Sequence, residues 1–350
     1  MSSEAAQARQ AQPLAADPAG RVLVAGASGY AGALAADLLW LHPGLELARV
    51  TARTDAGTRL DDLYPQHAVP LVLEELDPAA LEGIDAALVA YPHGASAPVV
   101  AELRGLGIKV IDLSADFRLR DLPLYESWYG EHGAPELLKG AVYGLTEIYR
   151  HEIVEAELVA NPGCYPTASL LALAPLASAG LIEDVVIDAK SGVSGAGRAA
   201  AEEMEMVKEV DDTRPYRVGG HRHVPEIGQE LAALGGEGEV SMSFVPHLLP
   251  FDQGELVSCY VRTTHRIEPA VLQDLYERVY ADEPFVELAQ EPPGVAEVRE
   301  TNLCRIHATV GGDGRVLAFA AIDNLWKGAA SQAIQNLNLM LGLPEGEGIS

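Results

Sequence analysis

The chain has 350 residues, which is long enough for two domains. Apolar residues make up 48% of it and charged residues 21%, which excludes a mainly disordered protein. The 51 acidic residues outnumber the 24 basic ones, and the formal net charge of −27 argues against binding to nucleic acid or to an anionic membrane.

The N-terminal segment and the cysteines narrow the class of protein further. Residues 1–20 are rich in Ala, Gln and Pro and predict a disordered tail, not a signal peptide. No apolar run approaches the roughly 20 residues of a membrane span. The three cysteines, Cys164, Cys259 and Cys304, are too few and too far apart for a disulfide framework or a zinc ribbon. We therefore expect a cytoplasmic enzyme.

The first half of the chain alternates short apolar strands with helices. Strands are predicted at 21–25, 45–51, 85–90 and 109–113, and helices at 31–41 and 95–106. This alternation is typical of a Rossmann-type, doubly wound parallel sheet with helices on both faces, in an α/β protein. We place this domain at residues 21–163.

The pattern changes after about residue 160. Helices are predicted at 166–179, 198–210 and 225–234, and strands at 183–189, 239–245, 254–263, 302–310 and 315–322. Few helices separate the later strands, so we predict an α+β domain with a mostly antiparallel sheet at 164–323. The last helix, 329–341, is amphipathic, and we expect the segment 324–345 to join the first domain.

A glycine-rich turn connects the first strand to the first helix. Gly26, Gly29 and Gly32 have the spacing Gly-x-x-Gly-x-x-Gly. Such glycines let the backbone approach a pyrophosphate, which the N-terminal N–H groups of the helix then bind. We predict a dinucleotide site that includes Ser28 and Tyr30. The alternative is a tight strand-to-helix turn without a ligand.

The end of the second strand predicts which dinucleotide binds. An NAD site carries Asp or Glu there, about 20 residues after the glycines, for the ribose hydroxyls. Here Thr51 and Arg53 occupy this region, and an arginine and a hydroxyl favour a 2′-phosphate. We therefore predict NADP. The alternative is that Arg53 is a solvated loop arginine.

Cys164 lies in the segment Asn161-Pro162-Gly163-Cys164-Tyr165-Pro166-Thr167, between a strand and a helix. The positive end of a helix stabilises a thiolate, and a thiolate can attack an acyl carbon. We predict that Cys164 is a nucleophile. The alternative, an inert buried thiol, is our prediction for Cys259 and Cys304, which lie inside predicted strands.

Two histidines and an acid follow one another where another helix is predicted to start. The segment His221-Arg222-His223-Val224-Pro225-Glu226-Ile227 carries groups that exchange protons near neutral pH. In an extended chain, side chains two residues apart point the same way. We predict an acid–base role and no metal, because no third ligand is nearby. A purely structural role is the other alternative.

At these motifs the chain resembles the N-acetyl-gamma-glutamyl-phosphate reductases, the NADP-dependent semialdehyde dehydrogenases of arginine biosynthesis. The resemblance runs from about Arg21 to Glu345, and its most specific piece is the segment 161–167. The supporting pieces are 26–32, Pro92-His93-Gly94, 114–119, 191–198, 221–227, Asp323-Asn324-Leu325 and Lys327-Gly328.

The resemblance implies roles for residues in the second domain. Cys164 would be the nucleophile, and His223, with His221 as the other candidate, would be the acid–base group. Glu226 would bind the substrate. Three further residues, Ser194, Gly195 and Asn324, would contact the cofactor.

The resemblance also assigns a residue of the first domain, since Arg118 would bind the substrate phosphate through its guanidinium fork. The sequence departs from the family pattern at three positions. Gln253 stands where an arginine is usual, and Thr146 and Ser331 replace Pro and Gly. These departures bear on local substrate contacts and on the subunit interface.

The implied reaction is the NADPH-dependent reductive dephosphorylation of N-acetyl-gamma-glutamyl phosphate through a Cys164 thioester. Three alternatives stay open: a reductase of carrier-protein-linked aminoadipyl or glutamyl phosphate, an aspartate-semialdehyde dehydrogenase-like enzyme, and a non-catalytic NADP sensor. We expect a small-molecule substrate and a homo-oligomer, either a dimer or a tetramer.

Overall fold

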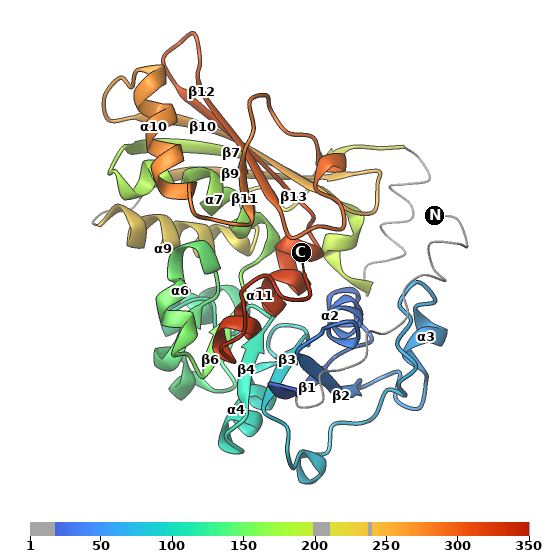
Figure 1. The fold of residues 1–350 in the computed structure, drawn as a ribbon. Coiled ribbons are helices and arrows are strands. Elements are labelled where there is room, and N and C mark those ends of the chain that lie inside the picture. The colour runs from blue at the N-terminus through green and yellow to red at the C-terminus, as the bar shows by residue number, and fades with distance from the viewer. Residues whose placement is uncertain (1–17, 199–210, 237–239, 350) are drawn as a thin grey trace. The chain divides into compact units, whose positions relative to one another are not determined.

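The computed structural model of the protein describes residues 18–198, 211–236 and 240–349. The chain divides into two compact units (Figure 1). The chain up to Pro162 forms the first unit together with the segment from Ala329 onwards, and Gly163–Gly328 form the second. The predicted tail at 1–20 and the predicted helix at 198–210 lie almost wholly outside the described residues.

The first unit is built on a six-stranded, fully parallel sheet with the order β2-β1-β3-β4-β6-β5. Short apolar strands suit such a sheet, because helices cover both of its faces. The order places β2 and β3 on opposite sides of β1. The topological switch point, where such folds bind ligands, therefore lies between β1 and β3. The strands are β1 (Gly20–Ala25), β2 (Leu45–Thr51), β3 (Ala86–Val89), β4 (Lys109–Asp112), β5 (Ala141–Tyr143) and β6 (Leu158–Ala160).

Helices flank this sheet (Figure 1). The core beneath α4 is apolar and includes Leu23 of β1, Val89 of β3, and Val100 and Leu103 of the helix itself. This confirms the predicted Rossmann-type fold class. The helices are α2 (Tyr30–Trp40), α3 (Leu60–Leu63), α4 (Ala97–Gly105), α5 (Leu122–Tyr129), α6 (Thr146–Val154) and α11 (Ser331–Met340), with short 3₁₀ turns at Pro78–Ala80 and Pro135–Gly140.

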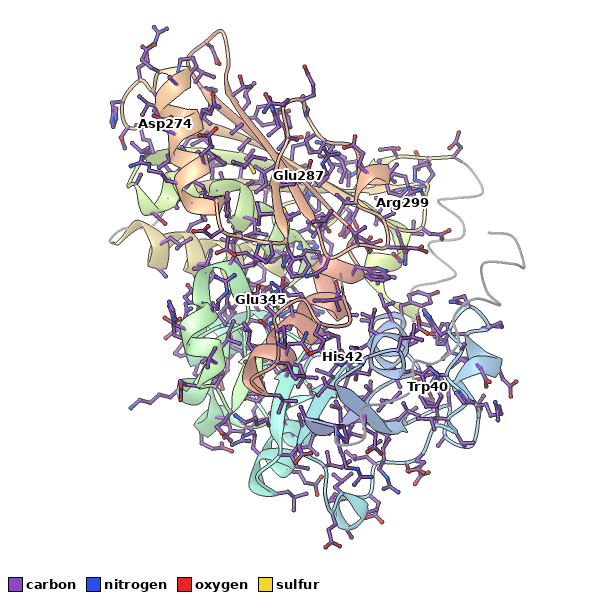
Figure 2. All side chains as sticks on the ribbon, viewed as in Figure 1. Trp40, His42, Asp274, Glu287, Arg299 and Glu345 are labelled. Atoms are coloured by element: carbon purple, nitrogen blue, oxygen red, sulfur yellow. The ribbon has the colours of Figure 1, made fainter. Side chains whose placement is uncertain are left out.

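The last helix, α11, differs from the amphipathic helix that the sequence predicted. Its polar residues Gln332, Asn336 and Asn338 are fully buried, because their side chains bind partners inside the first unit. Asn336 donates a 2.8 Å hydrogen bond to the carbonyl of Gly144. The Asn338 side-chain oxygen lies 3.1 Å from the imidazole of His42, which Figure 2 labels. A five-residue π-helical turn, Trp326–Ala330, precedes the helix.

The second unit contains a seven-stranded mixed sheet with the order β11-β12-β13-β10-β7-β9-β8. All neighbours are antiparallel except β7–β9 and β11–β12, so the predicted, mostly antiparallel sheet is confirmed. The strands are β7 (Ile182–Gly192), β8 (Arg214–Pro215), β9 (Ser241–Leu249), β10 (Glu255–Thr263), β11 (Val286–Leu288), β12 (Cys304–Val310) and β13 (Val316–Ile322).

Among the described residues of the second unit, the helices are α7 (Cys164–Ser178), α9 (His223–Gly235) and α10 (Pro269–Tyr280). Nearly every residue of α7 is buried, and the helix contacts β10 and β13. Helix α10 was not predicted, although its buried residues Leu272, Tyr276 and Tyr280 recur every four positions. Short 3₁₀ turns cover Val193–Ala196 and Val295–Glu297.

Candidate active site

Cys164 is the first residue of α7. The helix starts two residues earlier than predicted, after Gly163 in an extended conformation, and Pro166 occupies its first turn, where proline removes no helical hydrogen bond. The thiol therefore lies at the positive end of a long buried helix. Cys164 is partly exposed, whereas Cys259 and Cys304 are buried. Burial raises the pKa of the Cys259 thiol to about 12, which makes it unreactive at neutral pH.

Two neighbours fix the backbone at Cys164. The side chain of Glu226, on α9, is buried and accepts a 2.9 Å hydrogen bond from the backbone N–H of Gly163. On another side, Gly328 packs so close that an added Cβ would lie 2.8 Å from the Cβ of Cys164. Glu226, which the resemblance assigned to substrate, thus has a backbone partner one residue before the thiol.

A second acid, Glu255, faces the Cys164 thiol from the start of β10. Its side chain is fully buried, and burial raises its pKa to about 8, while the contact with Cys164 acts in the opposite direction. Sequence analysis missed this residue. A signal was present, since Glu255 shares the buried positions of β10 with Val257 and Val261, where an acid is unusual.

The two histidines pack together against one tyrosine. The rings of His221 and His223 lie 4.8 Å apart, and both pack edge-on against Tyr165, at 5.6 and 5.8 Å. The backbone N–H of His223 donates to Nδ1 of His221 at 3.2 Å. Helix α9 begins at His223, so this residue lies inside the helix and not, as predicted, before a helix opened by Pro225.

Burial and the neighbouring His223 lower the pKa of His221 to about 3. His221 is therefore neutral near pH 7 and accepts at Nδ1. A second tyrosine, Tyr216, which sequence analysis also missed, donates a 3.4 Å hydrogen bond to the Tyr165 hydroxyl. Tyr165 in turn donates to the carbonyl of His247 at 3.3 Å, so both phenols have partners.

Three residues predicted to contact the cofactor come together in the second unit. The Asn324 amide donates to the Ser194 hydroxyl at 2.9 Å, and its oxygen accepts from the backbone N–H of Gly254 at 2.8 Å. A Cβ on Gly195 would lie 3.4 Å from the Asn324 amide nitrogen. The units divide between Gly328 and Ala329, so Asn324 itself belongs to the second unit.

Gln253, where the resemblance led us to expect an arginine, lies in the same loop. Its carbonyl accepts a 2.8 Å hydrogen bond from Nε of Arg299, a residue labelled in Figure 2. The Arg299 guanidinium also stacks on the ring of Phe251, 5.3 Å from its centroid. A guanidinium therefore reaches this loop from another part of the chain.

The glycine-rich turn of the first unit fits a dinucleotide pyrophosphate. Gly26 has φ +90°, and a Cβ there would lie 2.7 Å from the carbonyl oxygen of Ala90, while a Cβ on Gly32 would collide with the backbone of Gly26. Gly29 is different, because its Cβ would meet only an ordinary contact at 3.8 Å. Packing within the protein does not require a glycine at the helix N-cap, whereas close approach of a ligand does.

Ser28 and Tyr30, the other two residues predicted to bind the cofactor at this turn, both contact Tyr64. The Tyr64 hydroxyl donates to the carbonyl of Ser28 at 2.7 Å. The ring of Tyr30 packs edge-on against Tyr64, with centroids 6.2 Å apart. Both predicted residues are therefore held at the start of α2.

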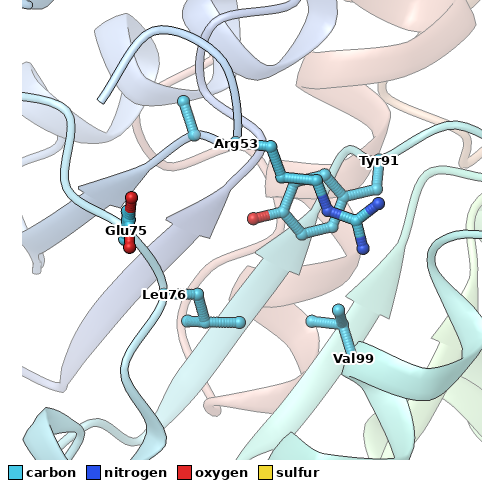
Figure 3. Close-up of a pocket in the computed structure, with 6 residues that line it drawn as sticks. Arg53, Glu75, Leu76, Tyr91 and Val99 are labelled. Carbon is cyan, nitrogen blue, oxygen red and sulfur yellow. The ribbon is translucent and has the colours of Figure 1, made fainter.

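A cavity of about 320 Å³ lies beside the end of β2, where Arg53 is found (Figure 3). The guanidinium of Arg53 stacks on Tyr91, 4.8 Å from the ring centroid, and donates to the carbonyl of Ala95 at 3.3 Å. Thr51 does not line the cavity, and its hydroxyl is buried without a hydrogen-bond partner. An acid, Glu75, does line it, and sequence analysis missed this residue. The full lining is Ala52, Arg53, Glu75, Leu76, Tyr91 and Val99.

Arg118, predicted to bind a phosphate, is almost buried in the first unit. Its Nε donates to the carbonyl of Asn161 at 2.7 Å and its Nη2 to that of Leu113 at 2.8 Å. Two carbonyls therefore set the plane of the guanidinium, which carries five N–H donors in all.

Two further features bear on the class of protein. Among the described residues, no three His, Cys, Asp or Glu side chains are grouped as a metal ion would need. Within the same ranges, no helix is both long and apolar enough to cross a bilayer.

Comparison with known proteins defines the class. Residues 21–156 match the semialdehyde dehydrogenase NAD-binding domain, and residues 164–324 match the semialdehyde dehydrogenase dimerisation domain. Aspartate semialdehyde dehydrogenase II of Vibrio cholerae has a similar fold, with a TM-score of 0.70 at 18% identity over 92% of this chain and 98% of that one. The Candida albicans enzyme, solved with NADP, aligns at 0.68 and 14% identity over 92% and 98%. The chain is an oxidoreductase with the domains of a semialdehyde dehydrogenase.

Curated relatives define the family more narrowly. The N-acetyl-gamma-glutamyl-phosphate reductase of Dehalococcoides mccartyi is 46% identical over 92% of this chain and 95% of its own length. That of a Geobacter species is 44% identical over 94% and 97%. The chain belongs to the family of N-acetyl-gamma-glutamyl-phosphate reductases.

Proposed function

We propose that the protein reduces N-acetyl-gamma-glutamyl phosphate with NADPH to N-acetyl-glutamate 5-semialdehyde and phosphate, in arginine biosynthesis. The observation that carries this proposal is the position of Cys164, partly exposed at the first residue of α7. The names and the 44–46% identity of the relatives support the choice of substrate. The match to a dimerisation domain supports a homo-oligomer, which we place in the cytoplasm.

Cys164 forms the covalent intermediate. Its thiolate attacks the acyl carbon, the carbon–oxygen bond to phosphate breaks, and the acyl group remains on the sulfur as a thioester. A bound nicotinamide supplies the hydride that reduces this thioester. The sulfur of the resulting thiohemiacetal then leaves as thiolate and frees the aldehyde. Because the acyl group stays attached to Cys164 throughout, it cannot diffuse away between the two steps.

A histidine transfers a proton to and from the substrate oxygen. We assign the acid–base role to His223, at the start of α9, and an orienting role to His221. The low pKa of His221 supports this division, because a histidine that stays neutral down to about pH 3 is a poor proton donor at neutral pH. In this proposal Arg118 binds the substrate phosphate, and Glu226 positions the Cys164 backbone through Gly163.

The cofactor of the proposal is NADP. Gly26, Gly29 and Gly32 would hold the pyrophosphate at the start of α2, and Arg53 would bind the 2′-phosphate beside Tyr91. In the second unit, the pair Ser194–Asn324, with Gly195 beside it, would contact the nicotinamide end.

The test is an assay of the reverse reaction. The enzyme is given phosphate, NADP and one of three aldehydes, and NADPH formation is followed at 340 nm. The aldehydes are N-acetyl-glutamate semialdehyde, aspartate semialdehyde and a carrier-protein-linked glutamate semialdehyde. We expect turnover with the first aldehyde at a kcat/KM at least a hundredfold above the others. Preference for either of the other aldehydes, or no turnover with any, contradicts the proposal. The strongly acidic charge of −27 already disfavours docking of an acidic carrier.

A further inference from the structure

Glu255 is a buried acid beside the nucleophile, and the mechanism above does not use it. Glu255 is the first residue of β10, and its register partners are Ser191 on β7 and Ile322 on β13. Its side chain lies on the face of β10 that α7 covers, and the first residue of α7 is Cys164. The fold therefore places the carboxyl group against the thiol.

The surroundings of Glu255 disfavour a permanent negative charge. The groups that face it are the Cys164 thiol and the Tyr165 phenol from α7, the Tyr216 phenol, and Asp323 just after β13. Neither oxygen of Glu255 has a conventional hydrogen-bond partner, which is costly for a fully buried group. Burial and the charge of Asp323 raise the pKa of Glu255 to about 8.

This environment makes the carboxylate of Glu255 a stronger base than an exposed carboxylate. Its raised pKa of about 8 lies close to the value of about 8.5 for an ordinary free thiol. Two ionisable groups in contact also titrate as a pair, because two negative charges at one buried place repel each other. Loss of one proton from the pair therefore disfavours loss of the second, and the two titration steps separate.

We propose that Glu255 takes the proton of the Cys164 thiol, which forms the thiolate that attacks the acyl phosphate, and returns the proton when the aldehyde leaves. The S–H bond breaks and an O–H bond forms on Glu255, while the sulfur electron pair forms the bond to carbon and phosphate leaves with the C–O electron pair. When the C–S bond of the thiohemiacetal breaks, sulfur recovers its electron pair and then the proton. Only the hydride transfer to the thioester changes an oxidation state, and the proton transfers do not. The inference rests on the function proposed above.

The test compares Glu255→Gln with a matched control. Glu230→Gln removes another buried carboxyl of the second unit, on α9, outside the residues assigned to catalysis. Without substrate or cofactor, the rate of iodoacetamide alkylation is measured from pH 5.5 to 10 on the peptide that contains Cys164, by mass spectrometry. We expect two steps in the wild-type pH profile, two in Glu230→Gln and one in Glu255→Gln.

Turnover supplies the second readout. At pH 7 we expect Glu255→Gln to lower kcat/KM roughly 10²-fold, the lower end of the range for general-base catalysis. The deficit should shrink as the pH rises towards 9.5, where hydroxide deprotonates the thiol without help. A purely structural role would give a deficit that does not change with pH. Identical alkylation profiles of wild type and Glu255→Gln overturn the inference, as does a pH-independent deficit.

If Glu255→Gln does not fold, thiolate absorbance at 240 nm in wild type, minus that of Cys164→Ser, reports the same two steps, and a single step overturns the inference. Alkylation needs no substrate, so it separates this inference from the proposed function. A wild type that oxidises none of the three aldehydes but shows the two steps refutes the function and supports the coupled pair of Cys164 and Glu255.

Discussion

A side-chain oxygen of Glu226 and the backbone N–H of Gly163 are joined by a 2.9 Å hydrogen bond in the interior of the second unit. Gly163 is the N-cap of α7, and a glycine has no side chain with which to cap the helix. The bond connects α9 to the residue before Cys164, so the two histidines on and before α9 and the thiol on α7 depend on a common support.

Removal of that acceptor should weaken both stability and catalysis. Glu226→Ala leaves a buried N–H unpaired, and we expect a loss of roughly 1–3 kcal/mol in the free energy of unfolding, measured with urea. Glu226→Gln keeps an acceptor oxygen and should lose less than half as much. Equal losses in the two variants would show that the hydrogen bond is not what stabilises the turn.

The three thiols should differ sharply in reactivity. Cys164→Ala should abolish turnover, whereas Cys259→Ala and Cys304→Ala should retain it, because both of these thiols are buried. The raised pKa of Cys259 makes its thiolate scarce at pH 8. Mass spectrometry after brief iodoacetamide treatment should find the label on Cys164 first. Inactivation accompanied by label mainly on another cysteine would contradict the assignment.

Cofactor preference should depend on Arg53. Arg53→Ala removes the cation beside Tyr91, and we expect KM for NADPH to rise at least tenfold while KM for NADH changes less than threefold. Arg49→Ala is the control, since Arg49 pairs with Glu74 and does not line the cavity. An equal rise in KM for both cofactors in Arg53→Ala would show that Arg53 does not bind the 2′-phosphate.

The histidines should separate in kinetics. We expect His223→Asn to lower kcat by about 10²–10⁴-fold with little change in NADPH affinity, and His221→Asn mainly to raise KM. The reverse pattern would assign the acid–base role to His221. Unchanged kcat in both variants would exclude this role for either residue.

His221 should also affect stability in acid. Its pKa is lower in the folded protein than the ordinary 6.5, so between pH 6.5 and 3 the unfolded chain binds more protons, and acidification destabilises the fold. From pH 7 to pH 4, His221→Asn should therefore lose less of its unfolding free energy than wild type. A parallel loss in the two proteins would contradict the shifted pKa.

Local sequence signals were sufficient for much of the fold. The alternation of short apolar segments with helices predicted the parallel sheet, and the segment 161–167 predicted a cysteine at a helix start. The start of α7 was misplaced by two residues because proline is favoured at several positions of a first turn. Helix α10 had a readable period in Leu272, Tyr276 and Tyr280, which sequence analysis passed over.

Other features depend on contacts between distant parts of the chain. Glu255 meets Cys164 only because β10 runs beneath α7, and no local pattern near either residue reports that pairing. Glu75 joins the cavity of Arg53 because residue 74 pairs with Thr51 at the edge of the sheet. The hydroxyl of Thr51 is buried without a hydrogen-bond partner, which no local sequence pattern predicts.

The buried amides of α11 determine when the first unit can be completed. Asn336 binds Gly144, and Thr146 donates to the Asn336 side-chain oxygen across 190 residues of chain. The ribosome synthesises the Rossmann strands first, and it synthesises α11 only after the whole second unit. The first unit therefore lacks the partner of the Gly144 carbonyl until α11 has been made, whereas every residue of the second unit, which is continuous in sequence, is made before α11.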